Sequence, residues 1–282
     1  MFQERLFPCG DFNLNGVTGP QTGPPILFLH GVTRCWQDFL TLMPSVAMRW
    51  TPHAIDFRGH GRSDRAKRYH VVDHIQDALA FLMQHFSEPV VLYGHSLGAL
   101  AAAALAAAAP DRVRAVILED PPAEPLLKNI RKTVFHTLFT LFRRFCGDER
   151  SVPEMAKDLG GYLMPLPSSN ASKTGAVRDA VSIRFMAKCL KQSDPELLTP
   201  VIDAVWLDGF DVENVFRNVK CPALLFRGDE SVGGMLSKDE GTRLARLLPD
   251  CTLIEWPGTG HLIHWLQPDA TAKYVTGFLE SL

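Results

Sequence analysis

Short runs of apolar and β-branched residues recur along the chain, and each run is closed by glycine, proline or polar residues. This pattern is typical of buried strands. Helical spacing of apolar residues separates several of the runs, at residues 71–86, 239–248 and 268–282. Strands that alternate with helices predict a parallel sheet covered by helices on both faces. The predicted core strands are Ile26–Leu29, Ala54–Phe57, Pro89–Tyr93, Val113–Leu118, Ala223–Phe226 and Thr252–Glu255.

The alternation stops between residues 123 and 216, where the pattern is helical and contains no convincing strand. We interpret residues 1–122 and 217–282 as one α/β core and residues 123–216 as a helical lid that lies over the ends of the sheet. Within the insertion, Lys128–Phe145 has apolar residues clustered on one side and basic residues elsewhere. The pattern predicts one amphipathic lid helix that faces an apolar cleft rather than a membrane surface.

The most informative motif is Gly94-His95-Ser96-Leu97-Gly98, which follows a predicted strand and precedes the alanine-rich segment Ala99–Ala109. A serine in a tight strand-to-helix turn, with glycine two positions to each side, is a nucleophile elbow. Side chains at positions 94 and 98 would strike neighbouring backbone, so glycine is required at both. The helix begins beside Ser96 with free N–H groups and a positive dipole end. The motif therefore predicts Ser96 as a nucleophile.

A serine hydroxyl needs a base within hydrogen-bond reach, and that base needs a carboxylate to orient it. Among ten histidines, His261 is the best candidate, because it ends the loop Pro257–His261 directly after the last predicted strand. In a parallel sheet this loop emerges at the same edge as the elbow. Three other histidines are expected to have structural roles: His264, which should point elsewhere, and His30 and His95, which should bond loop backbone.

Two aspartates compete for the role of the orienting carboxylate. Asp120 follows the strand that ends at Leu118, and Asp229 follows the strand that ends at Phe226. Both fit the chain order serine, acid, histidine. Glu119 and Glu230 rank lower, and Glu119 should point to the opposite side of its strand end.

Composition narrows the classes of partner. The net charge is −2 with a pI near 6.5, so electrostatics do not favour nucleic acid. The first ten residues lack the pattern of a secretory signal, and no apolar run reaches the length of a membrane span. Six cysteines are scattered without the spacing of metal ligands. We expect a cytoplasmic monomer or homodimer with reduced thiols, a small-molecule substrate and no stable membrane insertion.

These motifs together resemble those of serine-dependent α/β-hydrolases across nearly the whole chain. The resemblance implies the α/β-hydrolase fold with an inserted helical lid, and an oxyanion hole formed by the backbone N–H groups of Val32 and Leu97. The matching segments are Leu29-His30-Gly31-Val32, Asp56–Ser63, Gly94–Gly98, Phe226–Asp229 and Gly260-His261.

The resemblance also bears on the acid. In most members it lies a few residues past the glycine that ends the later strand, but Ser231–Gly234 holds no carboxylate here, and Asp229 directly follows Gly228. Some relatives carry the acid after the earlier strand instead. We therefore favour Asp120, with Asp229 as the alternative.

The expected reaction is hydrolysis of a carboxylic ester or lactone through an acyl-enzyme on Ser96, without cofactor or metal. An uncharged substrate with an apolar part is expected, because the insertion is rich in Phe, Leu and Met. Two alternatives stay open. One is a C–C bond hydrolase of a vinylogous diketone that uses the same triad, and the other is a non-catalytic binding protein with a hydrolase fold.

Overall fold

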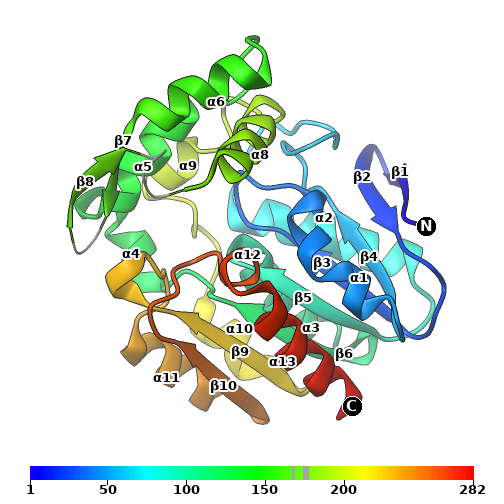
Figure 1. The fold of residues 1–282 in the computed structure, drawn as a ribbon. Helices are drawn as coiled ribbons and strands as arrows, with labels where there is room; N and C mark the ends of the chain where they lie inside the picture. Colours follow the sequence, from blue (N-terminus) through cyan, green and yellow to red (C-terminus); the bar gives the residue numbers. More distant parts are fainter. Residues whose placement is uncertain (167–168, 174–177) are drawn as a thin grey trace.

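The computed structural model describes residues 1–166, 169–173 and 178–282. Eight strands form one sheet in the order β1-β2-β4-β3-β5-β6-β9-β10, parallel from β4 to β10, with β2 antiparallel to both β1 and β4 (Figure 1). This confirms the predicted, mostly parallel sheet. The strands are β1 (Gln3–Cys9), β2 (Phe12–Thr18), β3 (Pro25–Leu29), β4 (Thr51–Ile55), β5 (Val90–His95), β6 (Val113–Glu119), β9 (Ala223–Gly228) and β10 (Cys251–Trp256).

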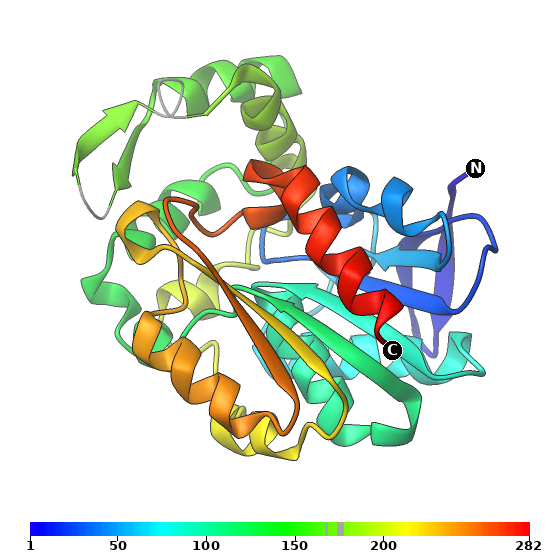
Figure 2. The ribbon, with the colours of Figure 1, turned by 60° about the horizontal axis from the view of Figure 1, so that its bottom comes forward.

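Helices cover both faces of the sheet, and Figure 2 shows α13 on one face and α11 on the other. Strands of such a sheet are apolar on both sides. In β5, Val90 and Leu92 belong to one apolar cluster, and Val91 and Tyr93 belong to the other. The first face carries α2 (Val71–His85), α3 (Leu97–Ala108), α10 (Val212–Asn218) and α11 (Lys238–Leu247); the second carries η1 (Trp36–Thr41), α1 (Met43–Val46), α12 (Ile263–Leu266) and α13 (Pro268–Glu280). Two short turns of 3-10 helix are η2 (Pro110–Arg112) and η4 (Glu230–Val232).

Between β6 and β9 the chain leaves the core and forms a separate group of elements, which we call the inserted segment (Figure 1). The inserted segment comprises α4 (Glu124–Lys128), η3 (Ile130–Lys132), α5 (Val134–Arg143), α6 (Val152–Gly161), β7 (Leu163–Leu166), β8 (Ser169–Lys173), α8 (Ala180–Lys191) and α9 (Thr199–Ile202).

None of the helices within the described ranges combines the length and the apolar character that crossing a membrane demands.

Two predictions for the inserted segment are wrong. The continuous helix expected over Lys128–Phe145 is divided into α4, η3 and α5. The breaks fall at Asn129 and Thr133, whose side chains donate to the backbone oxygens of Pro125 and Ile130 and so compete with helical hydrogen bonds. The segment also contains strands, because β7 and β8 pair antiparallel. They are short, and Pro165 interrupts the apolar run of β7, so the alternation that identifies a strand is missing.

The parallel strands present their carboxyl ends to the inserted segment. Strand β3 lies between β4 and β5, so the chain order reverses at β3. Ligands of open parallel sheets bind outside the carboxyl ends of the strands at such a reversal. Ser96 follows β5, Asp120 follows β6, and the loop that carries His261 follows β10. The fold therefore brings these three positions to the same edge of the sheet.

Candidate active site

Ser96 sits at the turn between β5 and α3, in a backbone conformation that L-residues rarely adopt. Its φ is 56° and its ψ is −114°. A Cβ at Gly94 would lie 2.1 Å from the carbonyl oxygen of Gly98, and a Cβ at Gly98 would lie 1.8 Å from the carbonyl oxygen of Leu29. Both contacts are far too short for real atoms. The geometry confirms that this turn needs glycine at both positions.

His261 is held by Asp120, the acid that the sequence favoured. Its Nδ1 lies 2.6 Å from Asp120 Oδ2. Asp120 is fully buried, and its carboxylate also accepts the backbone N–H groups of Gly228 (2.9 Å) and Met235 (2.8 Å). A carboxylate fixed by these contacts orients the ring with Nδ1 toward itself, which leaves Nε2 as the nitrogen for proton transfer.

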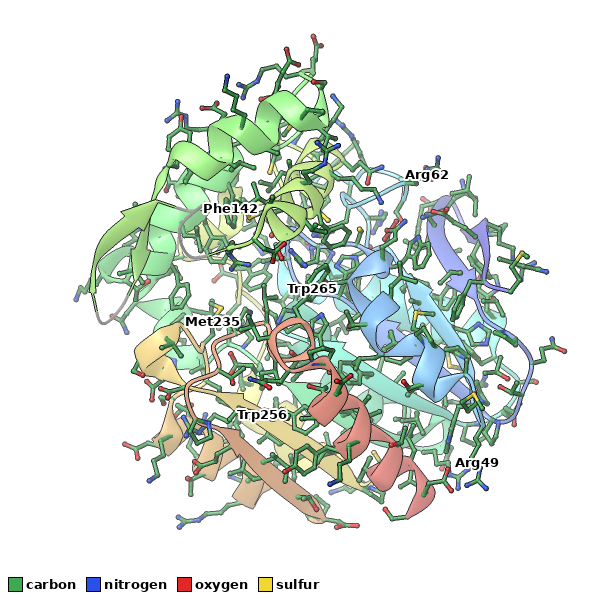
Figure 3. All side chains as sticks on the ribbon, viewed as in Figure 1. Arg49, Arg62, Phe142, Met235, Trp256 and Trp265 are labelled. Carbon is green, nitrogen blue, oxygen red and sulfur yellow. The ribbon has the colours of Figure 1, made fainter. Side chains whose placement is uncertain are left out.

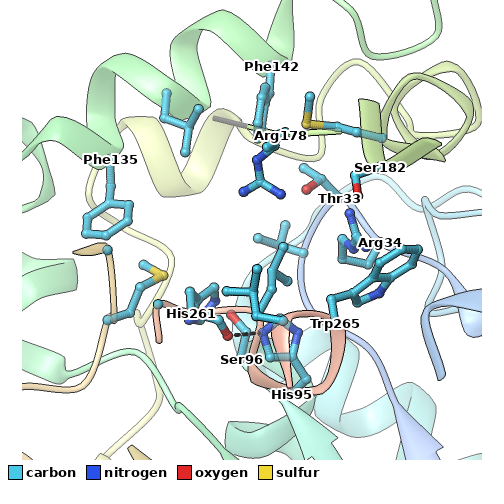
Figure 4. A pocket seen from close by; sticks show the side chains of 18 of the residues that line it. Thr33, Arg34, His95, Ser96, Phe135, Phe142, Arg178, Ser182, His261 and Trp265 are labelled. Atoms are coloured by element: carbon cyan, nitrogen blue, oxygen red, sulfur yellow. Dashed lines mark hydrogen bonds between the residues drawn. The ribbon is translucent and has the colours of Figure 1, made fainter. Parts of the chain in front are cut away.

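Ser96 and His261 line one cavity, and Figure 4 shows both at its floor. The Ser96 hydroxyl makes no hydrogen bond to any other residue in the described ranges. Hydrogen bonds between nucleophile and base are often long before a substrate binds and tighten in the complex. The arrangement brings the predicted nucleophile and the predicted base into one enclosed space, although they are far apart in sequence.

The two backbone N–H groups predicted for an oxyanion hole also lie beside the elbow. Leu97 begins α3, and Val32 follows Gly31, where an added Cβ would lie 3.1 Å from Cβ of Ser96. Across the described part of the chain, neither N–H has a hydrogen-bond acceptor. Free N–H groups at a helix start and in an adjacent loop are suited to a negatively charged oxygen.

Asp229, the alternative acid, does not contact His261. Its Oδ1 accepts the backbone N–H of Ser231 at 2.9 Å, and its Oδ2 accepts the backbone N–H of Gly258 at 2.8 Å. The bond from Gly258, followed by those from Ser231, lowers the pKa of the Asp229 carboxyl. Asp229 therefore ties the turn after β9 to the loop that carries His261. Glu230 likewise accepts the N–H of Lys238 (3.1 Å).

A second histidine and carboxylate pair lies near the first, and the ring of His95 contacts both histidines. His264 Nδ1 lies 2.8 Å from Glu119 Oε2, and His264 Nε2 lies 3.3 Å from Asp38 Oδ2. All three residues are fully buried. Burial alone would lower the pKa of His264, but Glu119 and Asp38 raise it to about 9. As expected from sequence, Glu119 and His264 thus point away from the cavity.

Other histidines fix the loops around Ser96. His95 Nε2 donates to the carbonyl oxygen of His261 (3.0 Å), and His30 Nε2 accepts the N–H of Phe57 (3.1 Å), so both bond loop backbone as expected. Burial lowers the pKa of His95 to about 3. His60 has a comparable role that was not predicted from the sequence, since its Nε2 accepts the N–H of Thr33 (3.2 Å). Its position between two glycines in a turn was the available signal.

The cavity has a volume of about 410 Å³ and lies between the core and the inserted segment, where Figure 3 shows Phe142, Met235 and Trp265. One wall is apolar and the other is polar. The described residues include no group of three or more His, Cys, Asp or Glu side chains placed to hold a metal ion. Helix α5 supplies the apolar wall, with Val134, Phe135, Leu138, Phe139 and Phe142. The polar wall is formed by Thr33, Arg34, Arg178, Asp179 and Ser182.

A family model and a curated relative both match most of this chain. The family model described as alpha/beta hydrolase fold matches residues 24–268. The chain is 26% identical over 290 residues to 2-(acetamidomethylene)succinate hydrolase of Mesorhizobium japonicum, covering 99% of this chain and 96% of that protein. The matched region includes every strand from β3 onwards and all three residues of the predicted triad.

Two solved structures superpose on nearly the whole chain. A crystal structure of E-2-(acetamidomethylene)succinate hydrolase superposes with a TM-score of 0.78 at 25% identity, covering 99% of this chain and 100% of that one. The enol-lactonase from Burkholderia xenovorans LB400 superposes with a TM-score of 0.74 at 18% identity, over 98% of this chain and all of that one. The fold implied by the sequence motifs, the α/β-hydrolase fold, is confirmed.

Proposed function

We propose that this chain, which belongs to the α/β-hydrolase fold family, is a serine hydrolase that cleaves a carboxylic ester or lactone through an acyl-enzyme. The observation that carries the proposal is the shared cavity floor, where Ser96 on its elbow lies with His261, and buried Asp120 holds that histidine. The relatives described above are named as hydrolases of different substrates, which supports hydrolysis as the reaction class.

In the proposed mechanism, His261 Nε2 takes the proton of the Ser96 hydroxyl as its oxygen attacks the substrate carbonyl carbon. The N–H groups of Val32 and Leu97 stabilise the oxyanion, and each is worth about 10²–10³ in rate. His261 then gives the proton to the leaving oxygen. A water molecule, deprotonated by His261, releases the acid and restores Ser96. Residues of this chain supply every step.

The inserted segment acts as the lid in this proposal. Helix α5 turns five apolar side chains into the cavity, which suits an apolar portion of the substrate next to the scissile bond. Enclosure also excludes bulk water and strengthens the hydrogen bonds to the oxyanion. The cavity volume of about 410 Å³ corresponds to a small molecule rather than a polymer.

The test combines covalent labelling with turnover. An organophosphonate should add to Ser96, detected by intact-protein and peptide mass spectrometry, and wild type should cleave 4-nitrophenyl esters of graded acyl length. Ser96→Ala should lower kcat by about 10⁴–10⁶-fold without loss of structure. Ser281→Ala removes an exposed hydroxyl far along the chain and serves as the matched control.

Two outcomes would overturn the proposal. Absence of both labelling and ester cleavage would favour the hydrolase-fold binding protein. Labelling of Ser96 without ester cleavage, together with loss of the absorbance of a dienol substrate, would favour the C–C bond hydrolase that uses the same residues.

A further inference from the structure

Two arginines on the polar wall of the cavity differ in how their charges are balanced. Arg34 forms an ion pair with buried Asp38, and its guanidinium lies 4.9 Å from the ring centre of Phe185 and 5.5 Å from that of Trp265. Arg178 also lines the cavity. Within the described residues it has no ion-pair partner and no hydrogen bond. Arg34 therefore has an ion-pair partner in the protein, whereas Arg178 has none among the described residues.

Asp179, the acid next to Arg178, also lines the cavity, but hydrogen bonds to the start of helix α8 occupy its carboxylate. Asp179 caps helix α8, where its carboxylate accepts the N–H (2.8 Å) and the hydroxyl (2.5 Å) of Ser182. Figure 4 shows the guanidinium of Arg178 pointing into the space between the apolar wall and the polar wall, above the floor formed by Ser96 and His261.

The charge of Arg178 persists at neutral pH. Burial, followed by the like charge of Arg34, lowers the pKa of Arg178 to about 10. A guanidinium withdrawn from bulk water and beside another cation is unfavourable unless an anion balances it. Its planar fork matches the two oxygens of a carboxylate, to which it donates two parallel hydrogen bonds. A carboxylate of the substrate can therefore supply the ion-pair partner that Arg178 lacks among the described residues.

We infer that the substrate carries a carboxylate, which Arg178 binds on the inserted side of the cavity while the scissile carbonyl lies at Ser96. The part about the scissile bond rests on the proposed function, whereas carboxylate binding by Arg178 does not. Arg34 is already paired with Asp38, whereas Arg178 forms no ion pair with any described residue, so Arg178 can bind one carboxylate at this position. The apolar wall formed by α5 then contacts the carbon chain between the carboxylate and the carbonyl. This replaces the uncharged substrate expected from sequence.

A kinetic test compares two esters of similar length, mono(4-nitrophenyl) adipate and 4-nitrophenyl heptanoate, with spontaneous hydrolysis subtracted. Wild type should prefer the adipate by about 10–100-fold in kcat/KM, mainly through KM, because a charge-assisted bidentate pair forms only with that ester. Arg178→Gln should bring the ratio close to one, and Arg178→Lys should keep part of it. Arg184→Gln removes an exposed arginine of helix α8, which begins just after Arg178, and should keep the full preference.

A binding test does not depend on turnover. Monomethyl adipate, which carries one carboxylate, and methyl heptanoate, which carries none, are titrated calorimetrically into Ser96→Ala and into the double variant Ser96→Ala with Arg178→Gln. Monomethyl adipate should bind Ser96→Ala at least about tenfold more tightly than methyl heptanoate, and the double variant should lose that difference. Equal binding of both esters by Ser96→Ala, or a preference for monomethyl adipate that survives Arg178→Gln, overturns the inference.

The two tests together separate this inference from the proposed function. If the binding of monomethyl adipate depends on Arg178 but no ester is cleaved and Ser96 is not labelled, the carboxylate site stands and the serine hydrolase proposal fails. If both esters are cleaved at rates that Arg178→Gln changes equally, the hydrolase proposal stands and the carboxylate site fails.

Discussion

Glu119 and Asp120 are adjacent at the end of β6, and each holds a histidine from the same stretch of chain in different surroundings. The pair of His264 and Glu119 is closed to solvent on every side and has Asp38 as a third member. The pair of His261 and Asp120 borders the cavity, and among the described residues Asp120 is the only carboxylate bonded to that histidine. Successive residues of a strand point to opposite faces, so the two acids serve opposite sides of the sheet end.

The surroundings of each histidine decide whether it can transfer a proton at neutral pH. His264 lies between two carboxylates that together raise its pKa to about 9, so it keeps its proton and cannot act as a base at neutral pH. Burial would raise the pKa of Glu119, but the positive charge of His264 lowers it to about 2. His264, Glu119, Asp38 and Arg34 form a balanced buried network. His261 has one carboxylate partner and an open side, which is the arrangement that proton transfer needs.

The largest expected effect comes from Asp120→Asn. The amide cannot orient and stabilise His261 as the carboxylate does, so kcat/KM should fall by about 10⁴-fold with 4-nitrophenyl esters. Thermal unfolding followed by circular dichroism would check that the fold is retained. A rate within a few fold of wild type would show that Asp120 is not the acid of the proposed triad.

The same chemical change one residue earlier should act on stability instead. Glu119→Gln leaves His264 with one of its two carboxylates in a buried site, and we expect a loss of about 3–5 kcal/mol in the free energy of unfolding. Urea denaturation measures this loss. Activity per folded molecule should stay far above that of Asp120→Asn, and a variant that folds stably but loses comparable activity would contradict the division of roles.

A smaller effect is expected in the pH dependence of stability. The pKa of His264 in the folded protein lies above its ordinary value near 6.5, so its stabilisation is complete below that pH and is lost as the pH rises through about 9. The shift corresponds to about 3 kcal/mol. Urea denaturation between pH 6 and 10 should show this decline in wild type. His264→Gln should have a flatter profile, and an unchanged profile would contradict the assignment.

The smallest effect is expected for Asp229→Asn. Asp229 accepts hydrogen bonds from Ser231 and Gly258 and has no contact with His261, so kcat/KM should change by less than about threefold and the free energy of unfolding should fall only slightly. Measured beside Asp120→Asn with the same ester, it is the matched control for the acid. If the Asp229 variant lost the larger share of activity, the two acids would exchange roles.

Much of the core could be predicted from the sequence because local rules govern it. The apolar runs gave six strands of the sheet, and the close contacts at Gly94 and Gly98 follow from the geometry of one tight turn. The inserted segment was harder to predict, since polar side chains at Asn129 and Thr133 divide a pattern that reads as one helix, and two short strands carry little alternation.

The sequence by itself determined the serine elbow, the histidine loop after the last strand and the two possible acids, since these depend on short stretches of chain. Only the tertiary structure decided which acid meets the histidine, because Asp120 and His261 are 141 residues apart and their contact depends on the order of strands in the sheet. It also decided the charge of the cavity. Nothing near Arg178 in the sequence indicates that Asp38 pairs with Arg34 or that Arg178 forms no ion pair with any described residue, because these pairings depend on the distances between groups from separate elements.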